Sequence, residues 1–164
     1  MRRLLLLVEL AVAVAVLLPG SARPAQGGTD LPFAASMAGH GTVNLVTGQA
    51  HNQLVARATQ FGLATLEESS QIVPVAPGVF LSIGTLTLTA ANGDQMFGSA
   101  TGTGNTTDGV HFTFSLHAVF SSGTGRFAGA SLAYDVQVHS TTVSVIGATA
   151  TSDLEATAVG RLSH

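Results

Sequence analysis

Apolar and polar positions alternate along most of the chain after about residue 30. The clearest run is Val110–Phe120, where apolar side chains occupy the even positions and polar side chains most of the odd ones. This period of two is typical of an antiparallel strand with one buried face and one solvated face. The same pattern recurs in Phe80–Ala91, where Leu86 and Leu88 alternate with threonines, and again from Leu132 to Val138. The alternation therefore predicts an all-β protein.

Turn-forming residues separate these runs. Asn92-Gly93 predicts a two-residue hairpin, because both residues can adopt a positive φ. Pro74 and Pro77 interrupt the preceding run, since proline cannot donate to a strand ladder. Further turns are expected near residues 48–52, 102–105 and 121–125, and two last strands are expected between Thr142 and Leu162.

The strand count suggests how the sheet closes. We expect about eight strands with turns roughly every ten residues, an arrangement typical of small β-barrels and sandwiches. Eight antiparallel strands with one apolar face close most economically into a β-barrel, because closure removes unpaired edge strands. A β-sandwich is the alternative.

The first residues have the order of a secretory signal peptide. A basic start, Met1–Arg3, precedes the run Leu4–Leu18, which is apolar except for Glu9, and small residues follow. As a helix at ~1.5 Å per residue the run spans about 22 Å, short of a ~30 Å hydrocarbon core. We therefore expect residues 1–27 to be a signal peptide and residues 28–164 a single domain. The protein would be secreted or extracytoplasmic, with no stable membrane insertion after cleavage.

The composition of the chain limits the classes of molecule that the protein can bind. Charged residues are 9% of the chain and hydrophobic residues 46%, which favours a packed core over disorder. From residue 28 onward eight acidic residues face three arginines, a net charge of −5 with histidine neutral. Nucleic-acid binding needs clustered basic residues, and the chain has no lysine, so this class is excluded. The chain has no cysteine, so its core must provide stability without disulfides.

Three segments resemble the allene oxide cyclase and dirigent β-barrel superfamily, in particular its small bacterial secreted members. They are Gly84–Asp94 (GTLTLTAANGD), Gly123–Ala130 (GTGRFAGA) and Ala58–Gly62 (ATQFG). The last is similar to a Thr-His-Leu-Gly element of that superfamily, with Gln60 in the histidine position. Together the segments cover the middle of the chain, from about residue 58 to residue 130.

The resemblance implies an eight-stranded antiparallel barrel with an apolar cavity, commonly oligomeric. Its members guide the cyclisation of reactive lipid, phenolic or polyketide intermediates, or have no known activity. It supplies the scaffold but no catalytic set, because the functional residues of the known members do not match this chain one by one. In the segment Gly123–Ala130 we expect Phe127 to plug one end of the barrel. Arg126 would bond turn carbonyls or a carboxylate; the alternative is a clamp for a substrate carboxylate.

Candidates for chemistry are few. The acid–base candidates are Glu67, Glu68, Asp135, Glu155 and Tyr134. Asp135 and Glu155 are out of phase with the apolar positions beside them, whereas Tyr134 is in phase and can present its hydroxyl to a ligand. The residues expected to line a ligand site are Leu86, Leu88, Phe112, Phe114, Leu116, Tyr134 and Arg126.

The histidines show no metal-ligand spacing. His111 and His117 share a strand face, but six residues at ~3.3 Å each place them about 20 Å apart, too far to hold one ion. We expect solvated strand histidines, no metal and no cofactor. There is no Gly-x-Ser-x-Gly elbow, and the glycine-rich Gly102-Thr103-Gly104 segment lacks the strand–helix context of a dinucleotide site.

Three functions fit these observations. The first is a secreted barrel that binds an apolar small molecule, and predicts an apolar lumen with few polar groups. The second is a cyclase or isomerase that acts by positioning a reactive apolar substrate, and predicts a buried acid or tyrosine in the lumen. The third is a structural or surface-interaction module with a filled barrel. We favour binding, because polar strand residues fall out of phase with the apolar face. The outer face also offers a surface for a homo-oligomer.

Overall fold

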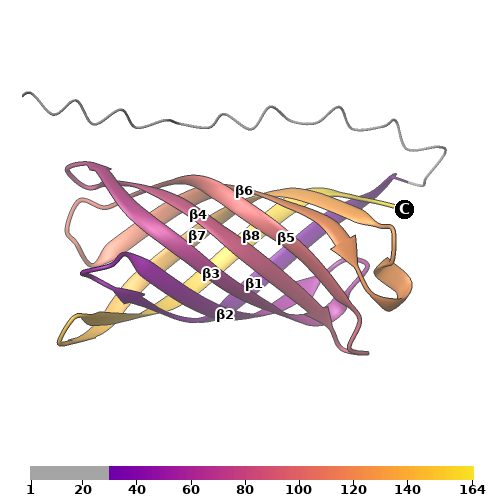
Figure 1. The fold of residues 1–164 in the computed structure, drawn as a ribbon, viewed down its shortest axis with the longest axis horizontal. Coiled ribbons are helices and arrows are strands. Elements are labelled where there is room, and N and C mark those ends of the chain that lie inside the picture. The colour runs from indigo at the N-terminus through magenta and orange to yellow at the C-terminus, as the bar shows by residue number, and fades with distance from the viewer. Residues whose placement is uncertain (1–29) are drawn as a thin grey trace, which may run out of the picture.

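The chain folds into a closed, eight-stranded antiparallel β-barrel (Figure 1). A computed structural model describes residues 30–164, and the expected signal peptide lies outside the described residues. The strands are β1 (Asp30–Asn44), β2 (Gln49–Ala58), β3 (Gly62–Ala76), β4 (Val79–Ala90), β5 (Gln95–Asn105), β6 (His111–Gly123), β7 (Ser131–Ile146) and β8 (Thr149–Ser163). The all-β barrel is thus confirmed over the sandwich. Within residues 30–164 no helix is long and apolar enough to cross a membrane.

Each strand pairs with its sequence neighbours, and the first pairs with the last. The β1–β8 seam runs from Asp30↔Ser163 to Asn44↔Thr149, so the ladder is continuous around the barrel. Because every connection is a hairpin, β1–β2, β3–β4, β5–β6 and β7–β8 turn at one end of the barrel, which we call the mouth. The other three hairpins and both ends of the described chain lie at the opposite end, which we call the closed end.

Alternation sets the core as the sequence predicts. Leu86, Leu88, Leu116 and Tyr134 are buried inside, whereas Thr85 and His117, each next to one of them in the chain, are exposed. Burial alternates in this way because successive side chains of a strand point to opposite sides.

Aromatic side chains fill the closed end. Phe61 stacks on Phe127 at 4.4 Å between ring centroids, and Phe33 stacks on Tyr134 at 5.2 Å. A short 3₁₀ turn at Gly125–Phe127 points Phe127 inward, where it is 2% exposed. This confirms the prediction that Phe127 plugs the barrel.

Several turn predictions were wrong in detail. Two strands were expected after Thr142, but β7 continues to Ile146 and a single strand, β8, follows; a shift in the β7–β8 register between Thr142 and Ser144 obscures the alternation there. At Asn92-Gly93 only Gly93 has a positive φ, and the Gly93 amide bonds the Ala90 carbonyl, so the loop is longer than a two-residue turn. The glycine-rich residues 102–105 lie within β5, where Gly104 leaves room for the Phe114 ring.

Candidate functional site

The barrel lumen holds a chamber at its mouth. The cavity measures about 200 Å³ and reaches up to Leu45 and Ile72 on the mouth hairpins. Binding pockets for drug-sized ligands usually measure ~300–1,000 Å³, so a ligand of this chamber is small or protrudes from the mouth.

The chamber walls are mostly apolar. Phe112 and Phe114 lie on the inner face of β6 with ring centroids 6.4 Å apart, and Phe80 of β4 meets Phe112 at 5.8 Å. The remaining apolar wall comes from Val43, Ala50, Ile72, Leu116, Val138 and Leu154. These half-buried phenylalanine rings present apolar surface to the chamber, so they suit a planar or aliphatic ligand body.

Four buried serines also line the chamber, one from each of four strands. They are Ser70 (β3), Ser82 (β4), Ser140 (β7) and Ser152 (β8), each 8% exposed or less. The Ser152 hydroxyl lies 3.5 Å from that of Thr142. A buried hydroxyl costs free energy unless it forms a hydrogen bond, so these serines offer partners to water or to polar groups of a ligand.

Glu68 and Asn52 form the floor of the chamber. They stand opposite each other in the β2–β3 register, and the Asn52 side-chain amide donates to Glu68 Oε2 at 3.1 Å. Both residues are half-buried and point inward. Gly41 of β1 leaves the space for Asn52, because a Cβ at position 41 would collide with Asn52 Oδ1. The sequence thus places one carboxylate inside an otherwise uncharged lumen.

A second, small void of about 30 Å³ lies on the other side of this floor. It shares Asn52 and Glu68 with the chamber and is also lined by Tyr134. Burial, helped by the negative charge of Glu68, raises the pKa of Tyr134 above its usual range. The Tyr134 hydroxyl therefore keeps its proton at neutral pH and is able to donate a hydrogen bond.

Most residues predicted to line a site do lie in the lumen. Phe112 and Phe114 line the chamber, Leu86 and Tyr134 line the inner void, and Leu116 lines both. Leu88 belongs to the packed core and borders neither cavity.

Arg126 lies elsewhere, exposed at the closed end. Its backbone amide donates to Asp94 Oδ2 at 3.2 Å, and its Nε lies 3.9 Å from the same oxygen. The guanidinium also covers the Phe127 ring at 4.7 Å. The carboxylate partner expected from the sequence is thus Asp94, which ties the Gly123–Ala130 turn to the β4–β5 hairpin.

The sequence reasoning missed the polar part of the lumen. It tested the phase of Asp135 and Glu155, which are indeed exposed, but not that of Glu68. Glu68 is in phase with Ala64 and Leu66, and Asn52 with Leu54. Extending the alternation by two residues toward the mouth, from Leu66 and from Leu54, would have placed both in the lumen. The statement that polar strand residues fall out of phase is therefore wrong for this half of the barrel.

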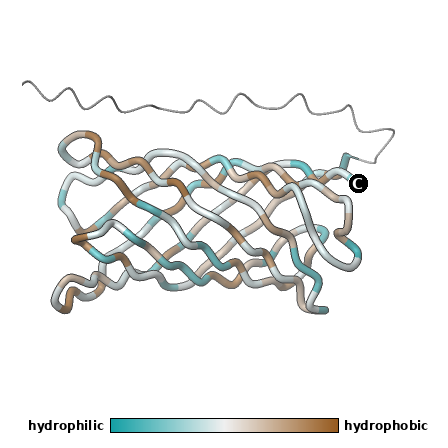
Figure 2. The backbone as a smooth tube through the Cα atoms, viewed as in Figure 1, coloured by the Kyte–Doolittle hydropathy of each residue, from teal (hydrophilic) through white to brown (hydrophobic). Residues whose placement is uncertain are grey.

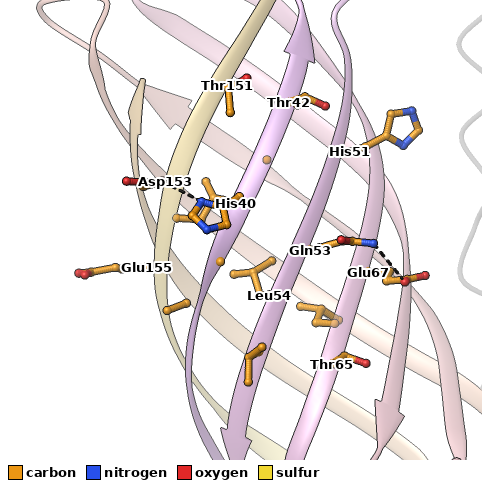
Figure 3. Close-up of a pocket in the computed structure, with 16 residues that line it drawn as sticks. His40, Thr42, His51, Gln53, Leu54, Thr65, Glu67, Thr151, Asp153 and Glu155 are labelled. Atoms are coloured by element: carbon orange, nitrogen blue, oxygen red, sulfur yellow. Dashed lines mark hydrogen bonds and ion pairs between the residues drawn. The ribbon is translucent and has the colours of Figure 1, made fainter. Parts of the chain in front are cut away.

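A larger hollow of about 960 Å³ lies on the outer wall, over β8, β1, β2 and β3 (Figure 3). On β1 it is lined by Ala38, Gly39, His40, Gly41 and Thr42. On its sides His40 Nδ1 lies 2.8 Å from Asp153, and Gln53 donates to Glu67 at 3.5 Å. The His40 and Asp153 side chains are 78% and 58% exposed, so water solvates both groups. This hollow is a shallow depression open to solvent, whereas the chamber is enclosed by the barrel wall.

Other histidines on the outer wall also pair with acids. His117 Nδ1 lies 2.7 Å from Asp135, and His111 Nδ1 lies 2.7 Å from Asp108. Within residues 30–164 no three histidine or acidic side chains gather in a geometry that could hold a metal ion.

Fold and site together define a class: a closed up-and-down β-barrel with one plugged end and a chamber that contains a single carboxylate. Comparison with protein-family models, with curated proteins and with solved structures found no match to this chain. The resemblance to the allene oxide cyclase and dirigent superfamily therefore stays a prediction from sequence motifs.

Proposed function

We propose that the barrel binds a small amphipathic molecule, with its apolar body between the chamber walls and a hydrogen-bond donor on Glu68. The observation that carries this proposal is the Glu68–Asn52 pair at the floor of a phenylalanine-lined chamber. A carboxylate at the bottom of an apolar pocket orients a ligand. A hydrogen-bond donor of the ligand is costly to bury without an acceptor, so it is placed on the carboxylate. Apolar contacts alone would not distinguish one end of the ligand from the other, whereas a hydrogen bond to Glu68 does.

A displacement assay tests this proposal. A neutral fluorescent probe, N-phenyl-1-naphthylamine, is bound to the protein and competed with nonylamine, nonanol and nonanoic acid. We expect the amine and the alcohol to displace the probe at lower concentration than the acid at pH 7, because the acid would set its carboxylate against Glu68. Equal displacement by all three would contradict the assigned orientation.

Neighbouring glutamates provide a matched pair of variants. Glu68→Gln keeps the size of the side chain but removes the charge from the lumen, whereas Glu67→Gln makes the same change on the outer wall. We expect only Glu68→Gln to abolish the preference for the amine over the acid. A Phe114→Ala variant should weaken the binding of all three competitors.

A second candidate is an isomerase or cyclase, favoured by the position of Glu68 on the chamber. A carboxylate that takes a proton from one atom of a bound substrate and returns it to another catalyses a proton shift. Incubation with a cell extract, followed by mass spectrometry, separates the two functions. A binder retains compounds unchanged, whereas an isomerase yields a product of the same mass and altered retention time that Glu68→Gln does not form.

A further inference from the structure

The mouth of the barrel is surrounded by exposed apolar side chains. Of the exposed large hydrophobic residues, eight lie on the mouth hairpins or the strand ends beside them: Leu45, Val46, Val73, Val75, Val110, Val143, Val145 and Ile146. We call this set the apolar rim. Figure 2 shows hydrophobic segments at the hairpin tips of this end. The other exposed large hydrophobics are scattered singly over the wall and the closed end.

The rim is a connected ring. Backbone hydrogen bonds join each mouth hairpin to the next: Leu45 to Ala148, Ile72 to Gly48, Thr106 to Gly78, and Thr142 to Val110. These four bonds measure 2.7–2.9 Å. The hairpin tips are therefore held beside one another around the lumen opening, and each of the four contributes exposed apolar side chains to it.

Charge is nearly absent from the rim. Residues 43–49, 71–81 and 141–149 contain no charged side chain, and the β5–β6 hairpin contributes Asp108, which pairs with His111. The barrel wall behind the rim differs, because it exposes Glu67, Asp135 and Glu155. A barrel with an apolar, uncharged end and a polar wall can insert that end into an apolar phase while the wall stays in water.

We propose that the apolar rim docks on the surface of a lipid bilayer, with the hairpin tips inserted among the lipids and the lumen open toward them. Large contiguous apolar patches on soluble proteins mark such interaction sites. The rim has no arginine or lysine to attract anionic headgroups, so a zwitterionic surface such as phosphatidylcholine fits its charge better than an anionic one. The rim also continues into the chamber through Leu45 and Ile72, so an apolar ligand could pass between membrane and lumen without crossing water. The docking itself does not depend on the proposed ligand.

The absence of cysteine makes a local test simple. Ala148→Cys places a single thiol on the rim, and Ala91→Cys places one on an exposed hairpin of the closed end. Each variant is produced as the full chain, purified as the cell exports it, and labelled with an environment-sensitive fluorophore. With phosphatidylcholine vesicles we expect a blue shift and increased emission from the rim label and no change from the closed-end label. Vesicles with added phosphatidylserine should bind no more tightly.

Two further substitutions separate the rim from general hydrophobicity. Ile146 is 80% exposed at the rim, and Val159 is 65% exposed on the outer wall of β8, so an aspartate at either position leaves the core intact. In the rim-labelled background, Ile146→Asp should raise the lipid concentration at half-maximal shift by about tenfold or more, since the charge would have to enter the apolar layer. Val159→Asp should leave it unchanged.

Three results would overturn the proposal. The first is a rim label that does not respond to any vesicle. The second is an equal response at the closed end, which would place the contact elsewhere. The third is a rim-label shift that grows with protein concentration in the absence of lipid and disappears in Ile146→Asp, which would identify a second copy of the chain as the occupant.

Discussion

Asn52 donates a hydrogen bond to Glu68 across the β2–β3 ladder, at 3.1 Å between Nδ2 and Oε2. The pair lies between the mouth chamber and the inner void, so it divides the lumen into a part open to ligands and a part closed by packing. A charged group is rarely buried without partners, because its desolvation is costly. Here the half-buried position and the amide of Asn52 reduce that cost while one edge of the carboxylate still faces the chamber.

Gly41 should be sensitive to the smallest enlargement. A Cβ in Gly41→Ala would collide with Asn52 Oδ1 and approach Leu154, so we expect a loss of about 1–3 kcal/mol in the free energy of unfolding. Urea denaturation measures the loss. In an Asn52→Ala background the same substitution should cost less, because the obstructing side chain is gone. Strict additivity of the two substitutions would show that Asn52 is not the obstacle.

Phe127 should contribute strongly to stability. Phe127→Ala removes a buried ring that stacks on Phe61, and we expect a loss of about 3–5 kcal/mol. Phe97→Ala, on the outer wall where the ring is 39% exposed, provides the control and should cost about 1 kcal/mol or less. Equal losses in urea denaturation would mean that the stacked aromatics do not plug the barrel.

Tyr134 should make the protein less stable in alkali. Its pKa is raised in the folded state, mainly by burial and also by the charge of Glu68, whereas the unfolded chain releases the proton near pH ~10. Stability is therefore fully present below pH ~10 and is lost as the pH rises toward the folded pKa, by up to ~1.4 kcal/mol per pH unit. Tyr134→Phe should lack this loss.

The same side chain reports its own titration. Because the chain has one tyrosine and no tryptophan, the phenolate absorbance belongs to Tyr134 alone. We expect this absorbance to appear at higher pH in the folded protein than in urea. Coincident titrations in the two solvents would place the hydroxyl in water.

Asp108 should hold the β5–β6 hairpin only above acid pH. Hydrogen bonds from the His111 side chain, then from the backbone amides of His111 and Val110, lower the pKa of Asp108 below its usual range. Its contribution is present above the ordinary pKa of an aspartate, ~3.9, and is lost as the pH falls from there toward the folded value. The carboxyl resonance of Asp108, followed by NMR against pH, measures this.

A variant separates the two kinds of bond to Asp108. His111→Ala removes the side-chain partner and leaves the backbone amides, so the midpoint of the Asp108 titration should rise but stay below the ordinary value. An unchanged midpoint would show that the imidazole has no influence on the carboxylate.

The alternation of apolar and polar residues was sufficient to predict which face of each strand points into the barrel. Residues such as Phe112, Phe114 and Leu116 lie inside because a strand has a strict period of two, and a period of two can be read without any tertiary contact. The plugging role of Phe127 was also predictable, since Phe127 is the one large apolar side chain of the glycine-rich turn. Turn types and strand ends were less predictable, because they depend on which carbonyl each amide meets in the neighbouring strand.

By itself, the sequence determined the all-β class, the inward-facing positions and the size of the sheet, because these follow from local periodicity and turn chemistry. Only the tertiary structure decided that Phe33 and Phe61 join Phe127 in the plug and that the other end stays open, since these three residues come from distant segments. The closed register likewise set Glu68 against Asn52 and brought four serines together in the chamber. Cross-strand distances depend on closure, so no spacing along the chain records them.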